Sequence, residues 1–384
     1  MPKRPALRTD RLDALARRLD RDAAAGLIAG AQVVVGRRDG VAFEHAAGWR
    51  DAAARDPLRP DAVWRIFSMT KPIVSVAAMV LVERGELRLD QPVAELIPAF
   101  ADLRVAAPGG GTVPAAAAPT VQDLLRHTAG LAYGYLDGGP AGRALARDGF
   151  LGADLPLGEL VERLAGFPLE HQPGKLWHYS HATEVLGRTV EVATGLGLGA
   201  ALRALVLDPL GMADTGFLLP ERDRARVAEP LPQPPGARPR FFDPCIPRRH
   251  ESAGGGLVST AADYARFCRM VLGRGTLEGA RVLGPATLAL MTADHLGRDT
   301  GRASYYPPGP GYGFGLGFAV RVAAGEAPFP GTPGDVFWSG VGGTYFWVDP
   351  ARDLFAVLML QSSSAEQRQG YRTLARAMVY AALD

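Results

Sequence analysis

The sequence predicts a mixed α/β (α+β) fold in which a mostly helical domain is inserted into a sheet-containing domain. Strand-like segments lie towards both ends of the chain, helical patterns dominate from about 120 to 215, and strands and helices do not alternate as βαβ units. The 384 residues, 47% of them hydrophobic, are enough for two domains with a sizeable core. We expect 1–95 and 248–384 to form the sheet-containing domain and 96–247 the helical one.

The N-terminal part predicts a helix, a hairpin and a second helix. Four apolar residues in an otherwise charged stretch predict an amphipathic helix: Leu12, Leu15, Leu19 and Ile28. The apolar segments 31–35 and 41–47 flank an Asp-Gly pair, which is typical of a β-hairpin. The segment 68–85 is apolar at helical spacing and ends at Gly85, a suitable helix C-cap.

Strand signals return near the C-terminus. The segments 336–338, 345–348 and 354–360 are rich in apolar and aromatic residues, and 349–353 between the last two has the composition of a turn. A final helix is expected over 363–383. Three low-complexity or Pro/Gly-rich segments predict loops: 106–119, 230–239 and 307–313.

The composition argues against several classes of function. The formal net charge is only +2, which gives no electrostatic footprint for nucleic acid or an anionic membrane. Two cysteines, Cys245 and Cys268, are too few for a disulfide framework or a four-ligand zinc site. Residues 1–25 lack the apolar core of a signal peptide, and the longest apolar run, 74–82, is shorter than the ~20 residues of a membrane span. We therefore expect a cytoplasmic protein.

Ser68 and Lys71 form a Ser-x-x-Lys pattern at the start of the second predicted helix. Residues three apart share one face of a helix, so the amine and the hydroxyl can come within hydrogen-bond reach. A buried lysine with a lowered pKa can activate a serine hydroxyl as a nucleophile. Only two other lysines exist, Lys3 and Lys175, but the pattern is short enough to occur by chance.

Tyr179 precedes a helical run at 182–193 and could project its phenol into a cleft. With a pKa lowered by Lys71, it could relay a proton to a leaving group. The alternative is a core tyrosine whose hydroxyl is satisfied by a neighbour. His171, His178 and His181 lie close by in the sequence, but no carboxylate or cysteine accompanies them at ligand spacing, so we expect no metal.

A third candidate segment, 338–343, reads Trp-Ser-Gly-Val-Gly-Gly between two predicted strands. Small residues there let a backbone approach a ligand closely, although a plain glycine-rich turn beside a core tryptophan has the same composition. The sequence contains no GxSxG centred on serine, no HExxH and no GxxxxGK[ST]. The nucleophile elbow of α/β-hydrolases, the zinc-protease helix and the P-loop are thereby excluded.

Taken together and in this order, the three segments resemble the serine β-lactamase/penicillin-binding-protein superfamily. The most similar branch is the class C-like group called family VIII carboxylesterases. The segment 68–71 is similar to the family's SxxK motif, and 179–181 falls where the family has Tyr-x-Asn. The segment 338–340 is similar to the Trp-x-Gly variant of the family's Lys-Thr-Gly. The similarity spans about 25 to 362.

The resemblance implies a β-lactamase-like fold: an antiparallel sheet flanked by terminal helices, an inserted helical domain, and an active site in the cleft between the domains. It implies that Ser68 is the acyl-forming nucleophile, that Lys71 is its base and that Tyr179 relays a proton. The backbone N–H groups of Ser68 and Val341 would form the oxyanion hole. The implied substrate-binding residues are Trp338, Ser339, Gly340, His181, Tyr133 and Phe314. It implies no cofactor and no metal.

Two departures from the family's pattern bear on the substrate. His181 replaces the usual asparagine, and no lysine follows Lys175, so the Lys-Thr-Gly amine that helps hold a β-lactam carboxylate is absent. Its loss disfavours anionic β-lactams and suits a neutral, apolar acyl or alcohol group.

We therefore expect a serine carboxylesterase that cleaves short acyl esters through an acyl-enzyme. The alternatives are a β-lactamase or D-amino-acid peptidase or transesterase of the same fold, and a non-catalytic penicillin-recognising module. The expected partner is a small-molecule ester, without nucleic acid or membrane, and the oligomeric state is left open.

Overall fold

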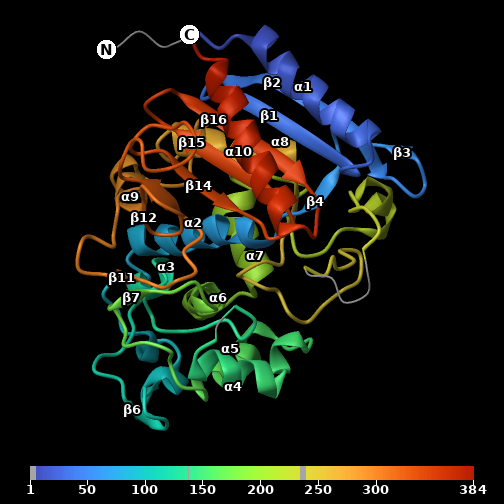
Figure 1. The fold of residues 1–384 in the computed structure, drawn as a ribbon. Helices are drawn as coiled ribbons and strands as arrows, with labels where there is room; N and C mark the ends of the chain where they lie inside the picture. Colours follow the sequence, from blue (N-terminus) through green and yellow to red (C-terminus); the bar gives the residue numbers. More distant parts are fainter. Residues whose placement is uncertain (1–5, 137, 234–238) are drawn as a thin grey trace.

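A central antiparallel sheet organises the molecule, which is described here by a computed structural model over residues 6–136, 138–233 and 239–384. The sheet has eight strands in the order β12-β13-β14-β15-β16-β1-β2-β3 (Figure 1). In chain order they are β1 (Gly30–Arg37), β2 (Gly40–Asp51), β3 (Asp56–Pro57), β12 (Tyr312–Phe314), β13 (Ala319–Arg321), β14 (Val336–Ser339), β15 (Tyr345–Asp349) and β16 (Leu354–Leu360).

The two ends of the chain meet in the middle of this sheet. β1 pairs with β2 in the predicted hairpin and with β16 on its other side, with Val33 opposite Leu358. Every residue of β1 and of β16 is buried. Strands that are apolar on both faces need cover on both faces, and helices supply it here.

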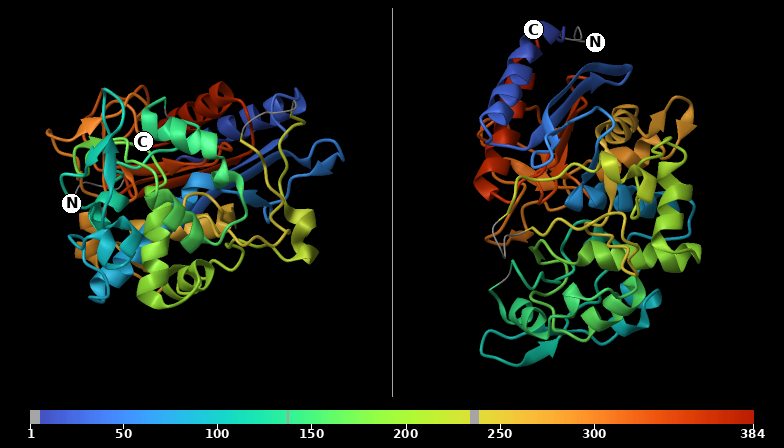
Figure 2. Two further views of the ribbon diagram at one scale, coloured as in Figure 1. Left: turned by 90° about the horizontal axis from the view of Figure 1, so that it is seen from below. Right: turned by 90° about the vertical axis from the view of Figure 1, so that its right-hand side faces the viewer.

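Three helices provide that cover. α1 (Thr9–Ala24) and α10 (Ala365–Ala381) lie side by side on one face of the sheet, and α8 (Ala261–Leu272) packs on the other (Figures 1 and 2). In α1 the predicted apolar residues Leu12, Leu15 and Leu19 are fully buried. Ile28 is buried too, but it lies beyond the end of the helix.

Below the sheet, α2 (Thr70–Glu83) runs through the centre of the molecule (Figure 1). Residues 70–81 are all buried, because α8 and the sheet lie above this helix and α6 (Ala182–Thr194) and α7 (Leu198–Leu202) pack against it. The remaining helices are α3 (Val121–Leu125), α4 (Pro140–Asp148), α5 (Leu157–Ala165) and α9 (Pro285–Met291). A π-helical turn, Arg203–Leu207, continues α7.

Short strand pairs complete the fold outside the main sheet. They are β4 (Val63–Arg65) with β8 (Val258–Thr260), β5 (Arg104–Ala106) with β6 (Thr112–Pro114), β7 (Leu176–Trp177) with β11 (Gly301–Arg302), and β9 (Thr276–Leu277) with β10 (Ala280–Arg281). Of these four pairs, the pair of β7 and β11 is parallel and the other three are antiparallel.

The predicted fold class is confirmed, with two local differences. The helix expected from 68 begins instead as a 3₁₀ turn, Phe67–Met69, and α2 starts at Thr70. Pro72 then falls in the first turn of α2, where its missing N–H costs no helical hydrogen bond. The segment 106–119 is not all loop, because β5 and β6 form a small hairpin there. Within the predicted loop 230–239, residues 234–238 lie outside the described residues.

All eight strands of the main sheet lie in 1–95 and 248–384, and α3 to α7 lie in 96–247. The exact division into two domains stays a prediction. Among the described residues no single helix has the length and apolar character to cross a membrane, and one strongly bent pair, Ala182–Thr194 with Leu198–Leu207, meets those criteria jointly.

Candidate active site

Ser68 lies on the tight 3₁₀ turn between β4 and α2, with its side chain half-buried. The preceding residue, Phe67, has a positive φ of 46°, an uncommon conformation for a side chain of this size. Its ring is held edge-on by Phe241 and Phe242, with centroids 5.6 and 6.1 Å away. The surrounding packing therefore holds the turn that presents Ser68.

Lys71 lies one helical turn after Ser68, and its Nζ is 3.4 Å from the Ser68 Oγ. The amine is buried and donates a 2.6 Å hydrogen bond to the Gly254 carbonyl. Burial lowers the pKa of Lys71 to about 7, although the negative charge of Glu184 opposes this change. A substantial fraction of the amine is thus neutral near pH 7 and able to accept a proton.

Glu184, for which the sequence predicted no role, holds the loop that carries this carbonyl. Its carboxylate accepts hydrogen bonds from the Ser252 hydroxyl at 2.5 Å and from the Ala253 N–H at 2.8 Å. The loop residue Gly254 leaves no room for a larger side chain, since a Cβ there would lie 2.8 Å from the Glu184 carboxylate. Glu184 therefore acts on Lys71 both by its charge and by positioning the 252–254 loop.

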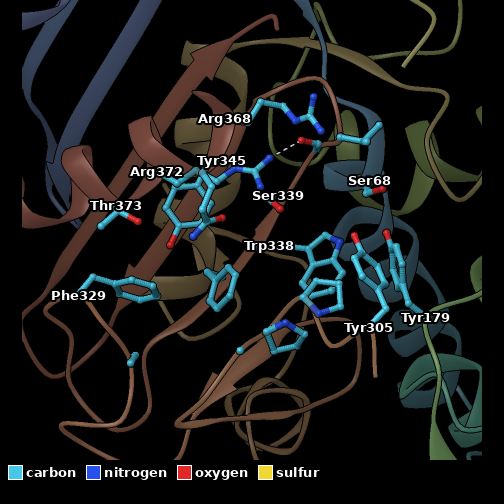
Figure 3. A pocket seen from close by; sticks show the side chains of 18 of the residues that line it. Ser68, Tyr179, Tyr305, Phe329, Trp338, Ser339, Tyr345, Arg368, Arg372 and Thr373 are labelled. Atoms are coloured by element: carbon cyan, nitrogen blue, oxygen red, sulfur yellow. Dashed lines mark hydrogen bonds between the residues drawn. The ribbon is translucent and has the colours of Figure 1, made fainter. Parts of the chain in front are cut away.

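Tyr179 lies beside Ser68 and Lys71, as the sequence predicted. The Lys71 Nζ is 4.8 Å from the centre of the Tyr179 ring, and the phenol oxygen faces Ser68 (Figure 3). The expected lowering of its pKa by Lys71 is wrong. Burial raises the pKa of Tyr179 above its ordinary value, and a side-chain hydrogen bond with Ser68 only partly offsets this. Tyr179 is therefore a neutral phenol that can donate and accept protons without ionising.

The turn after β14 brings a backbone segment close to Ser68. The Gly343 N–H donates to the Gly340 carbonyl, which places Val341 second in a four-residue turn. The Thr344 hydroxyl, next in the chain, ties this turn to the Ile66 carbonyl at 3.1 Å. A Cβ on Gly340 would come within 2.4 Å of that same carbonyl. Only glycine permits this approach, and Val341 and Ser68 consequently face the same cavity.

The cavity has a volume of about 330 Å³ and opens from Ser68 towards α10 (Figure 3). Tyr179, Val341 and the 338–340 segment line it near Ser68. Aromatic and proline side chains form most of the remaining wall: Tyr135, Tyr305, Pro307, Pro308, Pro310, Pro328, Phe329, Phe337 and Tyr345. Two arginines of α10, Arg368 and Arg372, also line the cavity. From the absence of a lysine at 338 we expected a site suited to a neutral, apolar acyl or alcohol group, and the sequence did not predict these two arginines.

Three of the predicted substrate-binding residues, Trp338, Ser339 and Gly340, line the cavity, and the other three do not. Tyr133, His181 and Phe314 are buried one layer behind it. Phe314 packs against Trp338, with centroids 5.3 Å apart.

His181 and Tyr133 pack together behind Tyr179. The ring of His181 lies 4.3 Å from that of Tyr133, centre to centre. Burial lowers the pKa of His181 to about 3, so its imidazole is neutral. Its ring nitrogens have no hydrogen-bond partner among the described residues, so this side chain does not hold Lys71. The described part of the chain also contains no group of three or more His, Cys, Asp or Glu residues arranged to hold a metal ion.

Comparison with known proteins identifies the family of this chain. The sequence profile of the Beta-lactamase family matches residues 15–380. Esterase EstB of Burkholderia gladioli is 37% identical over 377 residues, covering 92% of this chain and 91% of that protein. Protein Rv1367c of Mycobacterium tuberculosis is 39% identical over 364 residues, covering 88% and 86%.

Solved structures show the same fold. The structure described as "EstCE1, a hydrolase with promiscuous acyltransferase activity" superposes with a TM-score of 0.80 at 29% identity, covering 97% of this chain and 99% of that one. Simvastatin synthase (LovD) of Aspergillus terreus gives a TM-score of 0.78 at 23% identity, covering 97% and 98%, a likeness of fold alone. The family predicted from the sequence is confirmed, and the chain belongs to the Beta-lactamase family.

Proposed function

We propose that this protein is a serine carboxylesterase that hydrolyses small esters through an acyl-enzyme on Ser68. One observation carries the proposal: a buried amine with a pKa of about 7 lies 3.4 Å from a serine hydroxyl that opens into a largely aromatic cavity. The names of two relatives, an esterase and a hydrolase with acyltransferase activity, support it. The cytoplasmic location stays a prediction of the sequence.

In the acylation step, neutral Lys71 takes the proton of Ser68 as its Oγ attacks the ester carbonyl. The backbone N–H groups of Ser68 and Val341 donate to the developing oxyanion. The proton then passes from Lys71 through the Tyr179 hydroxyl to the leaving alcohol, so Tyr179 never carries a full charge. Water attacks the acyl-enzyme in the second step, and the same groups return the proton to Ser68.

A panel of substrates tests this function. The purified protein should hydrolyse 4-nitrophenyl acetate and butyrate with a burst or a steady rate that the Ser68→Ala variant lacks. A cephalosporin chromogen, run in parallel, tests the β-lactamase alternative. If the protein turns over the cephalosporin faster than any ester, the proposed function is wrong and the protein is a β-lactamase. Turnover of neither would favour the non-catalytic module.

Replacing Tyr179 by phenylalanine should lower kcat for an alkyl ester such as ethyl butyrate at least ~10²-fold, because its alcohol must be protonated to leave and the variant lacks the hydroxyl that relays the proton. The aromatic packing around the ring should persist, so the melting temperature should change little. Tyr135→Phe is the comparison variant. Tyr135 is exposed, and its ring lies 5.0 Å from that of Tyr133. It lines the outer wall of the cavity and lies outside the proposed proton path. An unchanged kcat in Tyr179→Phe would remove Tyr179 from the mechanism.

Activity should rise with pH through about 7, since Lys71 must be neutral to accept a proton and burial lowers its pKa to about 7. The raised pKa of Tyr179 keeps the phenol protonated across the plateau. A profile of kcat/KM from pH 5 to 9 checks this. A rate that is flat across pH 7, or that falls as pH rises through it, would contradict Lys71 as the base.

Replacing Glu184 by glutamine should move the acidic limb of this kcat/KM profile, the part in which activity rises with pH, to lower pH. The carboxylate favours the protonated amine, so loss of its charge lowers the pKa of Lys71 further. Glu162→Gln, at an exposed position on α5, is the control for a changed net charge. A limb that stays in place or moves to higher pH in Glu184→Gln would show that Glu184 does not act on Lys71 through its charge.

A further inference from the structure

We propose that Arg368 and Arg372 form an anion subsite in the active-site cavity, and that the preferred esters carry a carboxylate. The inference rests on the proposed function, and it names the substrate class. Both residues lie on α10, four positions apart and so on one face of the helix. Figure 3 shows their guanidinium groups in the cavity, with Arg372 between Tyr345 and the 339–340 segment.

Within residues 6–136, 138–233 and 239–384, no carboxylate neutralises these two charges. Among the described residues that line the cavity none is an aspartate or glutamate, and no described carboxylate forms an ion pair with Arg368 or Arg372. Burial lowers the pKa of Arg372 to about 10, and the nearby charge of Arg368 adds to the effect, yet the group remains a cation at neutral pH.

Their observed partners are backbone carbonyls and leave donors unused. Arg368 Nη1 donates to Ser362 O at 3.0 Å and to Ser363 O at 2.6 Å. Arg372 Nη2 donates to Gly340 O at 2.5 Å, while its Nε is buried without a hydrogen-bond partner among the described residues. A guanidinium has five N–H donors, so both groups retain capacity for a ligand.

The next arginine on the same face of α10, Arg376, is paired with a carboxylate. Arg376 is fully buried and pairs with the buried Asp335 at 2.8 Å. Leaving charge unpaired in a partly buried site is costly, because desolvation is not repaid by an ion partner. Among the described residues Arg376 has a carboxylate partner, whereas Arg368 and Arg372 have none. This contrast favours an external anion for the latter two.

A carboxylate fits this subsite best. The planar fork of a guanidinium matches the two oxygens of a carboxylate. Arg372 holds the carbonyl of Gly340, one residue before Val341, so its charge lies next to the proposed oxyanion hole. The cavity of about 330 Å³ has room for a small ester, whose apolar body would pack against the aromatic wall. In this proposal, helix α10 supplies the cation that position 338 lacks.

The carboxylate could belong to the acyl group or to the alcohol, and two matched pairs of substrates distinguish these sources. The acyl arm compares the mono-4-nitrophenyl ester of glutaric acid with its methyl-capped diester. The alcohol arm compares 4-butyryloxybenzoic acid with its methyl ester. In at least one arm kcat/KM should be ~10-fold or more higher for the charged member, as expected for a charge-assisted hydrogen bond.

Arg368→Gln and Arg372→Gln should each reduce this charged-to-neutral ratio several-fold. The ratio is the readout because loss of the Arg372 bond to Gly340 could slow both members of a pair equally. Arg17→Gln, at an exposed position on α1, changes the net charge by the same amount and should leave the ratio unaltered. In parallel, calorimetry with the inactive Ser68→Ala protein should show tighter binding of the charged ester.

The outcomes separate the two proposals. Neutral esters that are hydrolysed at least as well as the charged ones in both arms would overturn the anion subsite and leave the esterase intact. A preference that survives both arginine substitutions would also overturn it. Equal binding of charged and neutral esters by the Ser68→Ala protein, with no ester hydrolysed by the wild type, would overturn both proposals.

Discussion

Replacing Ser68 by alanine should lower kcat/KM for 4-nitrophenyl butyrate by at least ~10⁴-fold. The serine oxygen forms the covalent bond to the acyl group, and no neighbouring side chain can take over that role. Only the binding contribution and the oxyanion-hole donors would remain, which in serine hydrolases leave a small residual rate. Steady-state kinetics with active-site titration measure the loss.

The substitution should leave the fold intact, since it removes one half-buried oxygen from a turn held by Phe67 and by the hydrogen bonds around it. A melting temperature within a few degrees of wild type checks this. The exposed Ser304 provides a matched control, and Ser304→Ala should retain full activity. Activity near wild type in Ser68→Ala would end the assignment of Ser68 as the nucleophile.

Replacing Lys71 by methionine should reduce kcat by ~10²- to 10⁴-fold, the range for loss of a general base. Methionine has a similar length and no charge, so it suits a side chain that is almost completely buried. The remaining activity should no longer rise through pH 7, because the group that titrates there is gone.

Lys175→Met is the control for this experiment, since Lys175 is exposed and lies in the loop before Trp177, away from the cavity. It should keep both the wild-type rate and the wild-type pH profile. A Lys71→Met variant with unchanged kcat, or with an unchanged acidic limb, would show that another group activates Ser68.

Much of the fold could be predicted because its signals are local. The Asp-Gly turn at 39–40 sets the first hairpin, and the apolar runs at 345–348 and 354–360 closely match β15 and β16. The 3₁₀ turn at Phe67–Met69 could not be predicted in the same way. Its backbone conformation depends on Phe241 and Phe242, which are more than 170 residues away in the sequence.

The proximity of Ser68, Lys71 and Tyr179 was predictable because each lies in a recognisable motif. The wall of the cavity was not. Arg368 and Arg372 are spaced like solvent-exposed residues of an amphipathic helix, and only the packing of α10 against the sheet brings them to the cavity. The pKa of Tyr179 was misjudged because burial, which dominates it, cannot be seen in the sequence.

Glu184 was missed for a similar reason. An acidic residue in the first turn of a helix is common, since it interacts favourably with the helix dipole. The loop at 252–254 that gives Glu184 its second role lies about 70 residues further along the chain. The Gly254-Gly255-Gly256 run was the one available signal, because consecutive glycines indicate a close backbone approach.

An activated serine at position 68 is the central claim, and labelling with a fluorophosphonate followed by intact-mass measurement and peptide mapping tests it most directly. We expect one adduct per chain on Ser68, with labelling that slows sharply in Lys71→Met and persists in Lys175→Met. Absence of a label while a control esterase reacts, or an adduct on a different residue, would contradict the proposed mechanism.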